Sequence, residues 1–144
     1  MPRLPLILAV LGLIPFVWGA WTAHFGEGGW LGIARFSMPI YAAIILSFLG
    51  GAQWGMALAP GAPDGNRAIR LLISMIPSVA GWVIMTLPFT APQNKYLILA
   101  GLLVLWAAID HIYVRRGWAP DWYLMLRWPI TAVAAGCMVL GSLY

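Results

Sequence analysis

Five long apolar runs dominate this chain, and they constrain its fold more than any other feature. They cover approximately residues 4–23, 36–58, 71–89, 96–114 and 122–143. Each is close to the roughly 20 residues that an α-helix needs to cross the hydrocarbon core of a bilayer. The sequence therefore predicts a single all-α transmembrane domain over residues 1–144, built as a bundle of about five membrane-spanning helices.

The scarcity of charged side chains argues against a water-soluble globule. Eight Lys and Arg and four Asp and Glu make twelve charged residues in 144, or 8%, whereas soluble domains carry about 25%. The basic residues are scattered between the apolar runs, so the net charge of +4 does not indicate a nucleic-acid surface. We expect membrane lipids and other membrane proteins as partners, and no nucleic acid.

The distribution of basic residues predicts how the spans are oriented. Six lie on the N-terminal side of the alternating topology, namely Arg3, Arg67, Arg70, Arg115, Arg116 and Arg127. Two, Arg35 and Lys95, lie on the other side. Because cytoplasmic loops carry the excess of Lys and Arg, the N-terminus is expected inside and the C-terminus outside. The first run is longer than the apolar part of a signal peptide and lacks an A-x-A-like cleavage site, so we interpret it as a retained helix.

Polar side chains within the apolar runs are the candidate site residues, because each is costly in lipid and usually has a partner. Gln53, Asp110, His111 and Arg127 all fall near the inner ends of their predicted helices. At 1.5 Å per residue they share a layer about 10 Å deep. The sequence thus predicts one polar cluster at the inner leaflet.

Within this cluster, Arg127 is the expected counterion of Asp110. Arg115 points about 140° around the helix from Asp110 and is a poor partner. A guanidinium–carboxylate pair would join both oxygens in a bidentate contact. Two interpretations remain open: a structural pair or snorkelling side chains, or a lipid or quinone site in which Trp54 or Trp128 lies beside the bound head group.

Small residues and tryptophans predict helix contacts. Ser47, Gly51 and Gly55 form a small-xxx-small ladder, which marks a close contact either with another helix of the chain or with a partner. Trp54, Trp82 and Trp106 lie within spans, and we expect them to pack between helices.

No catalytic or cofactor motif is visible. The sequence lacks C-x-x-C-H, a P-loop, a zinc signature, a nucleophile elbow and paired glutamates. His24 and His111 are expected at opposite membrane faces, so they would not share one haem. We therefore predict that the chain is not an enzyme, with no metal site and no cofactor, and we leave a bound lipid or quinone open.

Three segments together resemble a known family. They are residues 47–55 (SFLGGAQWG), 77–82 (PSVAGW) and 119–127 (APDWYLMLR). Their order and spacing are similar to those of an uncharacterised membrane family that includes mitochondrial transmembrane protein 69 and proteobacterial relatives. The positions that match this pattern are Gly50, Gly51, Trp54, Trp122, Tyr123 and Arg127. The resemblance implies an energy-coupling membrane but no activity.

These observations favour a non-catalytic accessory or assembly subunit of a larger respiratory or photosynthetic membrane complex. The alternative is a quinone- or lipid-binding membrane protein that uses the inner-leaflet cluster. A small transporter is the least favoured function, because the chain has few intramembrane charges and no clear half-repeats. The expected location is the bacterial inner membrane, with several passes.

Overall fold

The computed structural model describes residues 2–88 and 90–144. Its helices are α1 (Arg3–Leu11), α2 (Ile14–Phe25), α3 (Gly29–Leu58), α4 (Arg67–Thr86), α5 (Pro92–Arg115) and α6 (Trp122–Gly141). Helices α1 and α2 together form one span, so five segments are long and apolar enough to cross a membrane. The structure confirms the predicted all-α fold with five spans.

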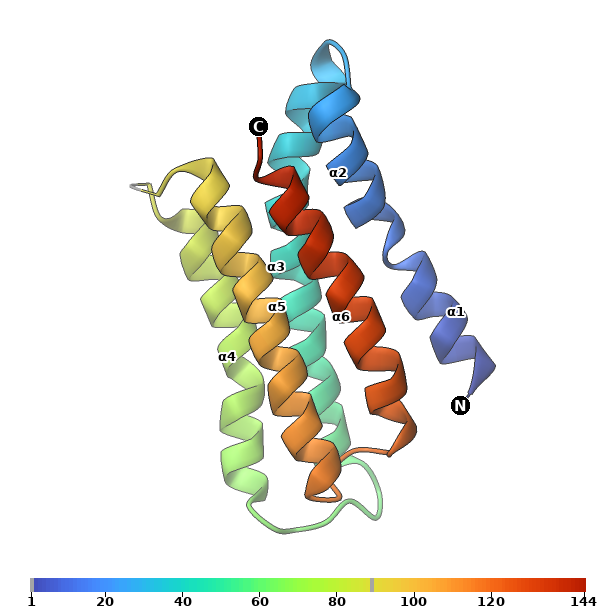
Figure 1. The fold of residues 1–144 in the computed structure, drawn as a ribbon. Coiled ribbons are helices and arrows are strands. Elements are labelled where there is room, and N and C mark those ends of the chain that lie inside the picture. Colours follow the sequence, from blue (N-terminus) through green and yellow to red (C-terminus); the bar gives the residue numbers. More distant parts are fainter. Residues whose placement is uncertain (1, 89) are drawn as a thin grey trace.

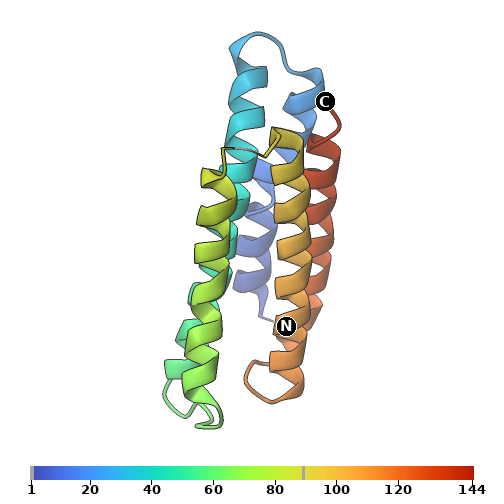
Figure 2. The same cartoon turned by 90° about the vertical axis from the view of Figure 1, so that its left-hand side faces the viewer.

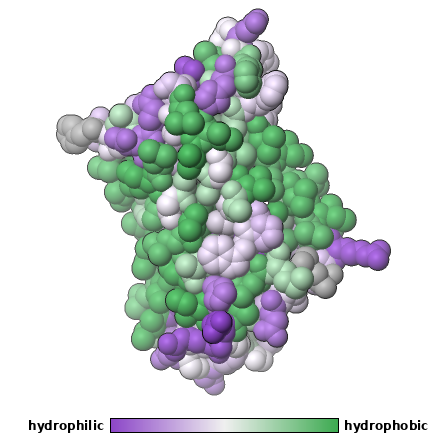
Figure 3. All heavy atoms as spheres, in the orientation of Figure 1, coloured by the Kyte–Doolittle hydropathy of each residue, from purple (hydrophilic) through white to green (hydrophobic). Residues whose placement is uncertain are grey.

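The helices run roughly alongside one another in one bundle (Figures 1 and 2). Helix α3 packs mainly against α4, α5 packs against α6, and α2 packs against both α3 and α6. We call the end that carries the α3–α4 and α5–α6 loops the lower end, and the end that carries the α2–α3 loop the upper end (Figure 1). Hydrophobic residues cover the middle of the face drawn in Figure 3, and hydrophilic residues gather towards its two ends.

The first span is broken between α1 and α2, whereas the sequence predicted one helix over residues 4–23. Pro15 causes the break, because it has no N–H to donate to the carbonyl four residues earlier and its ring crowds that carbonyl. The carbonyl oxygen of the next residue, Gly12, accepts a hydrogen bond of 2.7 Å from the Tyr41 hydroxyl of α3. A side chain of the neighbouring span therefore compensates for the interruption.

Helix α3 begins at Gly29, earlier than the predicted start at residue 36. Gly28 precedes it with a φ of 60°, a left-handed conformation that glycine adopts without strain. In lipid, backbone groups must be bonded within the helix, so helical order extends through glycines that would weaken it in water. With 30 residues, α3 is about 45 Å long, against about 30 Å for the 20 residues of α4. Helix α4 ends at Thr86, and Phe89, the expected end of the third span, lies outside the described residues.

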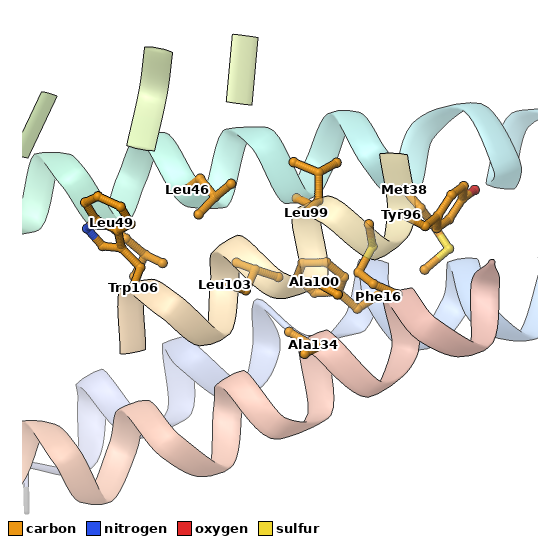
Figure 4. Close-up of a cluster of buried hydrophobic side chains, with 13 residues drawn as sticks. Phe16, Met38, Leu46, Leu49, Tyr96, Leu99, Ala100, Leu103, Trp106 and Ala134 are labelled. Carbon is orange, nitrogen blue, oxygen red and sulfur yellow. The ribbon is translucent and has the colours of Figure 1, made fainter. Parts of the chain in front are cut away.

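The core is centred on one face of α5 (Figure 4). Tyr96, Leu99, Leu103 and Trp106 recur at intervals of three and four residues and are almost completely buried, as expected for one stripe of a helix. They meet side chains from α2, α3 and α6, among them Phe16, Met38, Leu46 and Ala134. This packing runs along α5 from Tyr96 to Trp106, and the polar cluster lies next to Trp106 in the lower half of the bundle.

Helices α3 and α4 approach each other most closely at glycines. A Cβ at Gly50 would collide with the backbone carbonyl oxygen of Ser74, and a Cβ at Gly81 would lie 3.2 Å from Cβ of Ala43. By contrast, added Cβ atoms at Gly51 and Gly55 would meet nothing within 4 Å. The predicted ladder therefore makes no close contact within the described chain, and the contact is made one residue earlier, at Gly50.

Candidate functional site

A buried polar cluster joins three helices in the lower half of the bundle. Gln53 on α3 and Asp110 on α5 are almost inaccessible, and Arg127 on α6 is 6% exposed. The Gln53 amide nitrogen donates to Oδ1 of Asp110 at 2.7 Å, and Nε of Arg127 donates to Oδ2 at 2.9 Å. The structure therefore brings together three of the predicted site residues and confirms the Asp110–Arg127 pair.

The geometry of that pair differs from the bidentate contact that we expected. Only Nε of Arg127 contacts the carboxylate, because Gln53 occupies the second oxygen. The two terminal nitrogens of the guanidinium turn away and donate to the Thr131 hydroxyl and, at 3.4 Å, to the Leu103 carbonyl oxygen. Because Arg127 is buried, it does not snorkel to the head groups.

The cluster is closed on its far side by Trp106, whose indole N–H donates to the Gln53 carbonyl oxygen at 3.2 Å. Each buried polar group thus has a partner, which is what a charge pair requires in a medium of low dielectric. The network links α3, α5 and α6, so its first role is structural.

His111 and Trp128 do not belong to this cluster. The Trp128 indole N–H lies 3.2 Å from Nδ1 of His111, and Nε of Arg115 lies 3.2 Å from Nε2. A neutral imidazole accepts at only one nitrogen, so one of these two contacts holds at a time. The group lies at the exposed surface of α5 and α6, separate from Gln53 and Asp110.

Trp54 also points away from the cluster. It is 42% exposed and lies with Ser47, Gly51 and Gly55 on the outward face of α3. Trp82 is 66% exposed, so the prediction that these two tryptophans pack between helices is wrong. Trp106, by contrast, is buried as expected.

A groove of about 490 Å³ opens on the other side of Arg127. It lies between α1, α3 and α6, and Leu103 of α5 also contributes to its lining. Apolar side chains form nearly all of its wall, including Leu8, Ala9, Phe48, Ala52 and Ala134. Four of the lining side chains of α6 carry polar atoms: Trp122, Tyr123, Arg127 and Thr131. The groove lies against the cluster but shares only Arg127 with it.

Helix α1 forms the outer wall of this groove, and none of its residues is buried. It has little packing with the rest of the bundle beyond a few contacts with α6. Elements with few buried contacts open at low free-energy cost. The groove is therefore bounded on one side by a loosely held helix.

A second arginine is buried at the lower end. Arg70, at the start of α4, donates to the Pro63 carbonyl oxygen, and its guanidinium carbon lies 4.9 Å from the centre of the Trp118 ring. Arg116 contacts the same ring at 5.3 Å. Nε of Arg70 and the Tyr113 hydroxyl are buried without a hydrogen-bond partner among the described residues. These groups fasten the α3–α4 loop to the α5–α6 loop.

Sequence reasoning did not identify the groove. Thr131 was not singled out, and Tyr123 was noted only through the family resemblance. A signal was present, because Tyr123, Arg127 and Thr131 follow one another at intervals of four and so share one face of α6. The position of α1, which completes the groove, has no comparable signal in the sequence. Within residues 2–88 and 90–144, no three His, Cys, Asp or Glu side chains gather as a metal site would require.

Comparison with known proteins agrees with the resemblance of the three sequence segments. The chain is 30% identical over 142 residues to transmembrane protein 69 of Xenopus tropicalis, covering 99% of this chain and 54% of that protein. It is 27% identical over 133 residues to transmembrane protein 69 of Mus musculus, covering 92% of this chain and 53% of that protein. The chain thus spans about half the length of these curated relatives. No solved structure shows significant similarity to it. A family described as a protein of unknown function, DUF3429, matches residues 1–143, and this multi-pass membrane chain belongs to that family.

Proposed function

We propose that this chain is a non-catalytic membrane protein that holds one long-chain, lipid-soluble molecule, a lipid or a quinone, in the groove between α1, α3 and α6. The observation that carries this proposal is the groove itself. Its volume of about 490 Å³ lies within the range of roughly 300–1,000 Å³ that is typical of ligand pockets. Such pockets are mostly apolar with a few convergent polar groups, which is the composition of this wall.

The hydrogen bonds of Arg127 support this position for the ligand rather than one inside the Gln53–Asp110 cluster. Within the cluster, both carboxylate oxygens of Asp110 and the amide group of Gln53 are bonded to other members. An arginine has five N–H groups, and the described partners of Arg127 are three: Asp110, Thr131 and Leu103. Two donors of a side chain that lines the groove therefore remain for a bound molecule.

Native mass spectrometry after purification in mild detergent tests the proposal. We expect one lipid or quinone molecule to remain bound to each chain when the detergent is removed in the spectrometer. The Ala52→Trp substitution puts a large ring into the groove and should abolish this adduct. Ala132→Trp is the matched control, because Ala132 is exposed on α6 and does not line the groove. Equal adducts on both variants would contradict the proposal.

A second candidate function, an accessory or assembly subunit of a larger energy-transducing membrane complex, is favoured by the outward face of α3. Ser47, Gly51 and Gly55 are exposed there, and such ladders allow close approach of another helix. Affinity purification from native membranes should recover a reproducible membrane partner with the wild-type chain but not with Gly51→Leu. Recovery of the same proteins with both chains would exclude this face as the docking surface.

We also propose that the lower end faces the cytoplasm of a bacterium and that the protein resides in the inner membrane. Five of the six basic residues of the predicted inner side belong to helix ends and loops, and the sixth, Arg127, lies in the half of α6 nearer the lower end, which supports this orientation. Single cysteines at Asp64 and Gln93, in a Cys137→Ser background, should react oppositely with an impermeant thiol reagent in intact cells. Position 93 should be labelled and position 64 should be protected. The converse pattern would show that the lower end faces the outside of the cell.

A further inference from the structure

The polar wall of the groove contains hydrogen-bond donors but no net charge. Arg127 is the only charged side chain among the described residues that line the groove. Its charge is balanced by Asp110, whose Oδ2 lies 2.9 Å from Nε of Arg127 and which does not line the groove. A phosphate-bearing head group would therefore add an uncompensated negative charge to an apolar cavity, which costs several kcal/mol.

The polar side chains that line the groove offer hydrogen-bond donors, so they suit a ligand that carries a hydrogen-bond acceptor. Two of the five N–H groups of Arg127 have no hydrogen-bond partner among the described residues. The Thr131 hydroxyl accepts a hydrogen bond from Arg127, so its own hydrogen is free to be donated. Tyr123 also lines the groove, and its hydroxyl forms no side-chain hydrogen bond with the described residues.

Arg127 and Thr131 lie well inside the candidate span formed by α6, whereas Tyr123 lies in its first turn. Arg127 and Thr131 are five and nine residues from the first residue of α6, Trp122. At 1.5 Å per residue, this places them about 8 and 14 Å along the helix. A ligand that reaches them must carry its polar group into the hydrocarbon region, which an uncharged group does at lower cost than an ion.

Together these observations define a ligand class, an inference that rests on the proposed function of the groove. We infer that the groove selects an uncharged molecule whose carbonyl oxygens accept hydrogen bonds from Arg127 and Thr131 or, nearer the start of α6, from Tyr123, and whose long apolar chain extends towards Phe16. A quinone ring and the ester of a neutral glycerolipid both supply this chemistry. A carbonyl-free hydrocarbon and an anionic phospholipid do not.

Equilibrium binding to the full chain in detergent, measured by native mass spectrometry with four probes, tests the inference. The probes are decylubiquinone, a diacylglycerol, phosphatidylglycerol and a carbonyl-free isoprenoid hydrocarbon of similar length. We expect at least one carbonyl probe to bind about tenfold more tightly than the hydrocarbon, as one or two hydrogen bonds would give. The comparison of decylubiquinone with diacylglycerol identifies the source of the carbonyl.

Two conservative variants test whether the hydroxyl groups of Tyr123 and Thr131 bind the carbonyl probe. Tyr123→Phe and Thr131→Val remove hydroxyl groups with almost no change of volume, and each should weaken the preferred carbonyl probe several-fold while leaving the hydrocarbon unchanged. Asp110→Asn removes the balancing charge and should shift the preference towards phosphatidylglycerol. The wild-type chain and the two hydroxyl variants keep the test interpretable if Asp110→Asn fails to fold.

The outcomes separate the inference from the proposal on which it rests. Equal affinity for the carbonyl probes and the hydrocarbon, or a wild-type preference for phosphatidylglycerol, would overturn the inferred ligand class but leave a groove that binds lipids. Failure of all four probes to bind would remove the proposed function and the inference together.

Discussion

Nε of Arg127 lies 2.9 Å from Oδ2 of Asp110, and this contact fastens α6 to α5 in the lower half of the bundle. Both side chains are buried, so neither charge has water as an alternative partner. Removal of one partner leaves an isolated charge in a medium of low dielectric, whereas removal of both leaves none.

This relationship predicts strong non-additivity. Asp110→Ala or Arg127→Met alone should each lower the free energy of unfolding by about 3–5 kcal/mol, and the double variant should recover a large part of that loss. The measurement is a double-mutant cycle from equilibrium unfolding in detergent. The exposed pair Asp64–Arg67 is the control, and Asp64→Ala should change stability by less than about 1 kcal/mol. Additive losses at Asp110 and Arg127 would show that the pair is not coupled.

Adjacent glycines of α3 should differ in their response to the same substitution. Gly50→Ala places a methyl group against the Ser74 carbonyl oxygen, so α3 and α4 must separate, and we expect a loss of about 1–3 kcal/mol. Gly51→Ala meets nothing within 4 Å and should be neutral or slightly stabilising. Thermal unfolding of the two variants, monitored by circular dichroism in the same detergent, measures the difference. Equal melting temperatures would contradict the close α3–α4 approach.

Tyr41→Phe tests the break in the first span. The substitution removes the hydroxyl that donates to the Gly12 carbonyl oxygen, and a lost hydrogen bond of this kind costs about 1 kcal/mol. Because α1 has no buried residues, the effect should appear as faster amide hydrogen exchange in α1 and in the first turn of α2, with α4 unchanged. Unchanged exchange in α1 would show that the tyrosine does not hold the break.

Trp118→Ala should loosen the lower loops. The indole ring contacts the guanidinium groups of Arg70 and Arg116, and each such contact is worth about 0.5–1 kcal/mol or more when shielded from water. Limited proteolysis should therefore cleave the α3–α4 loop faster in this variant. Trp118→Phe keeps an aromatic face and should retain part of the protection. Identical cleavage of all three proteins would contradict the proposed fastening.

The features that could be predicted from sequence are those for which a lipid environment permits only one structure. A run of about 20 apolar residues must be helical in a bilayer, so the five spans were found. Asp110 and Arg127 were paired correctly because an isolated charge at that depth is too costly to leave alone. Both inferences depend on the free energy of placing an unpaired backbone group or an isolated charge in lipid. Neither requires knowledge of how the helices are arranged.

The features that were missed depend on the arrangement of helices. Gly50 and Gly51 are neighbours, and only the position of Ser74 on α4 decides which of them lies in the contact. Trp54 and Trp82 are as apolar as Trp106, yet α5 is central and its tryptophan is buried. The groove likewise requires α1 to stand beside α6, and no residue pattern in α1 specifies that neighbour.

Helix α3 has a further consequence for the surrounding bilayer. At about 45 Å it exceeds a hydrocarbon core of roughly 30 Å, which α4 matches. The apolar run of α3, residues 36–58, is about 35 Å long, and residues 29–35, which include Arg35, extend about 10 Å further at the upper end. The first two turns of α3 would therefore project beyond the hydrocarbon core and offer lipid head groups, or a partner outside the bilayer, a helical surface that α4 does not have.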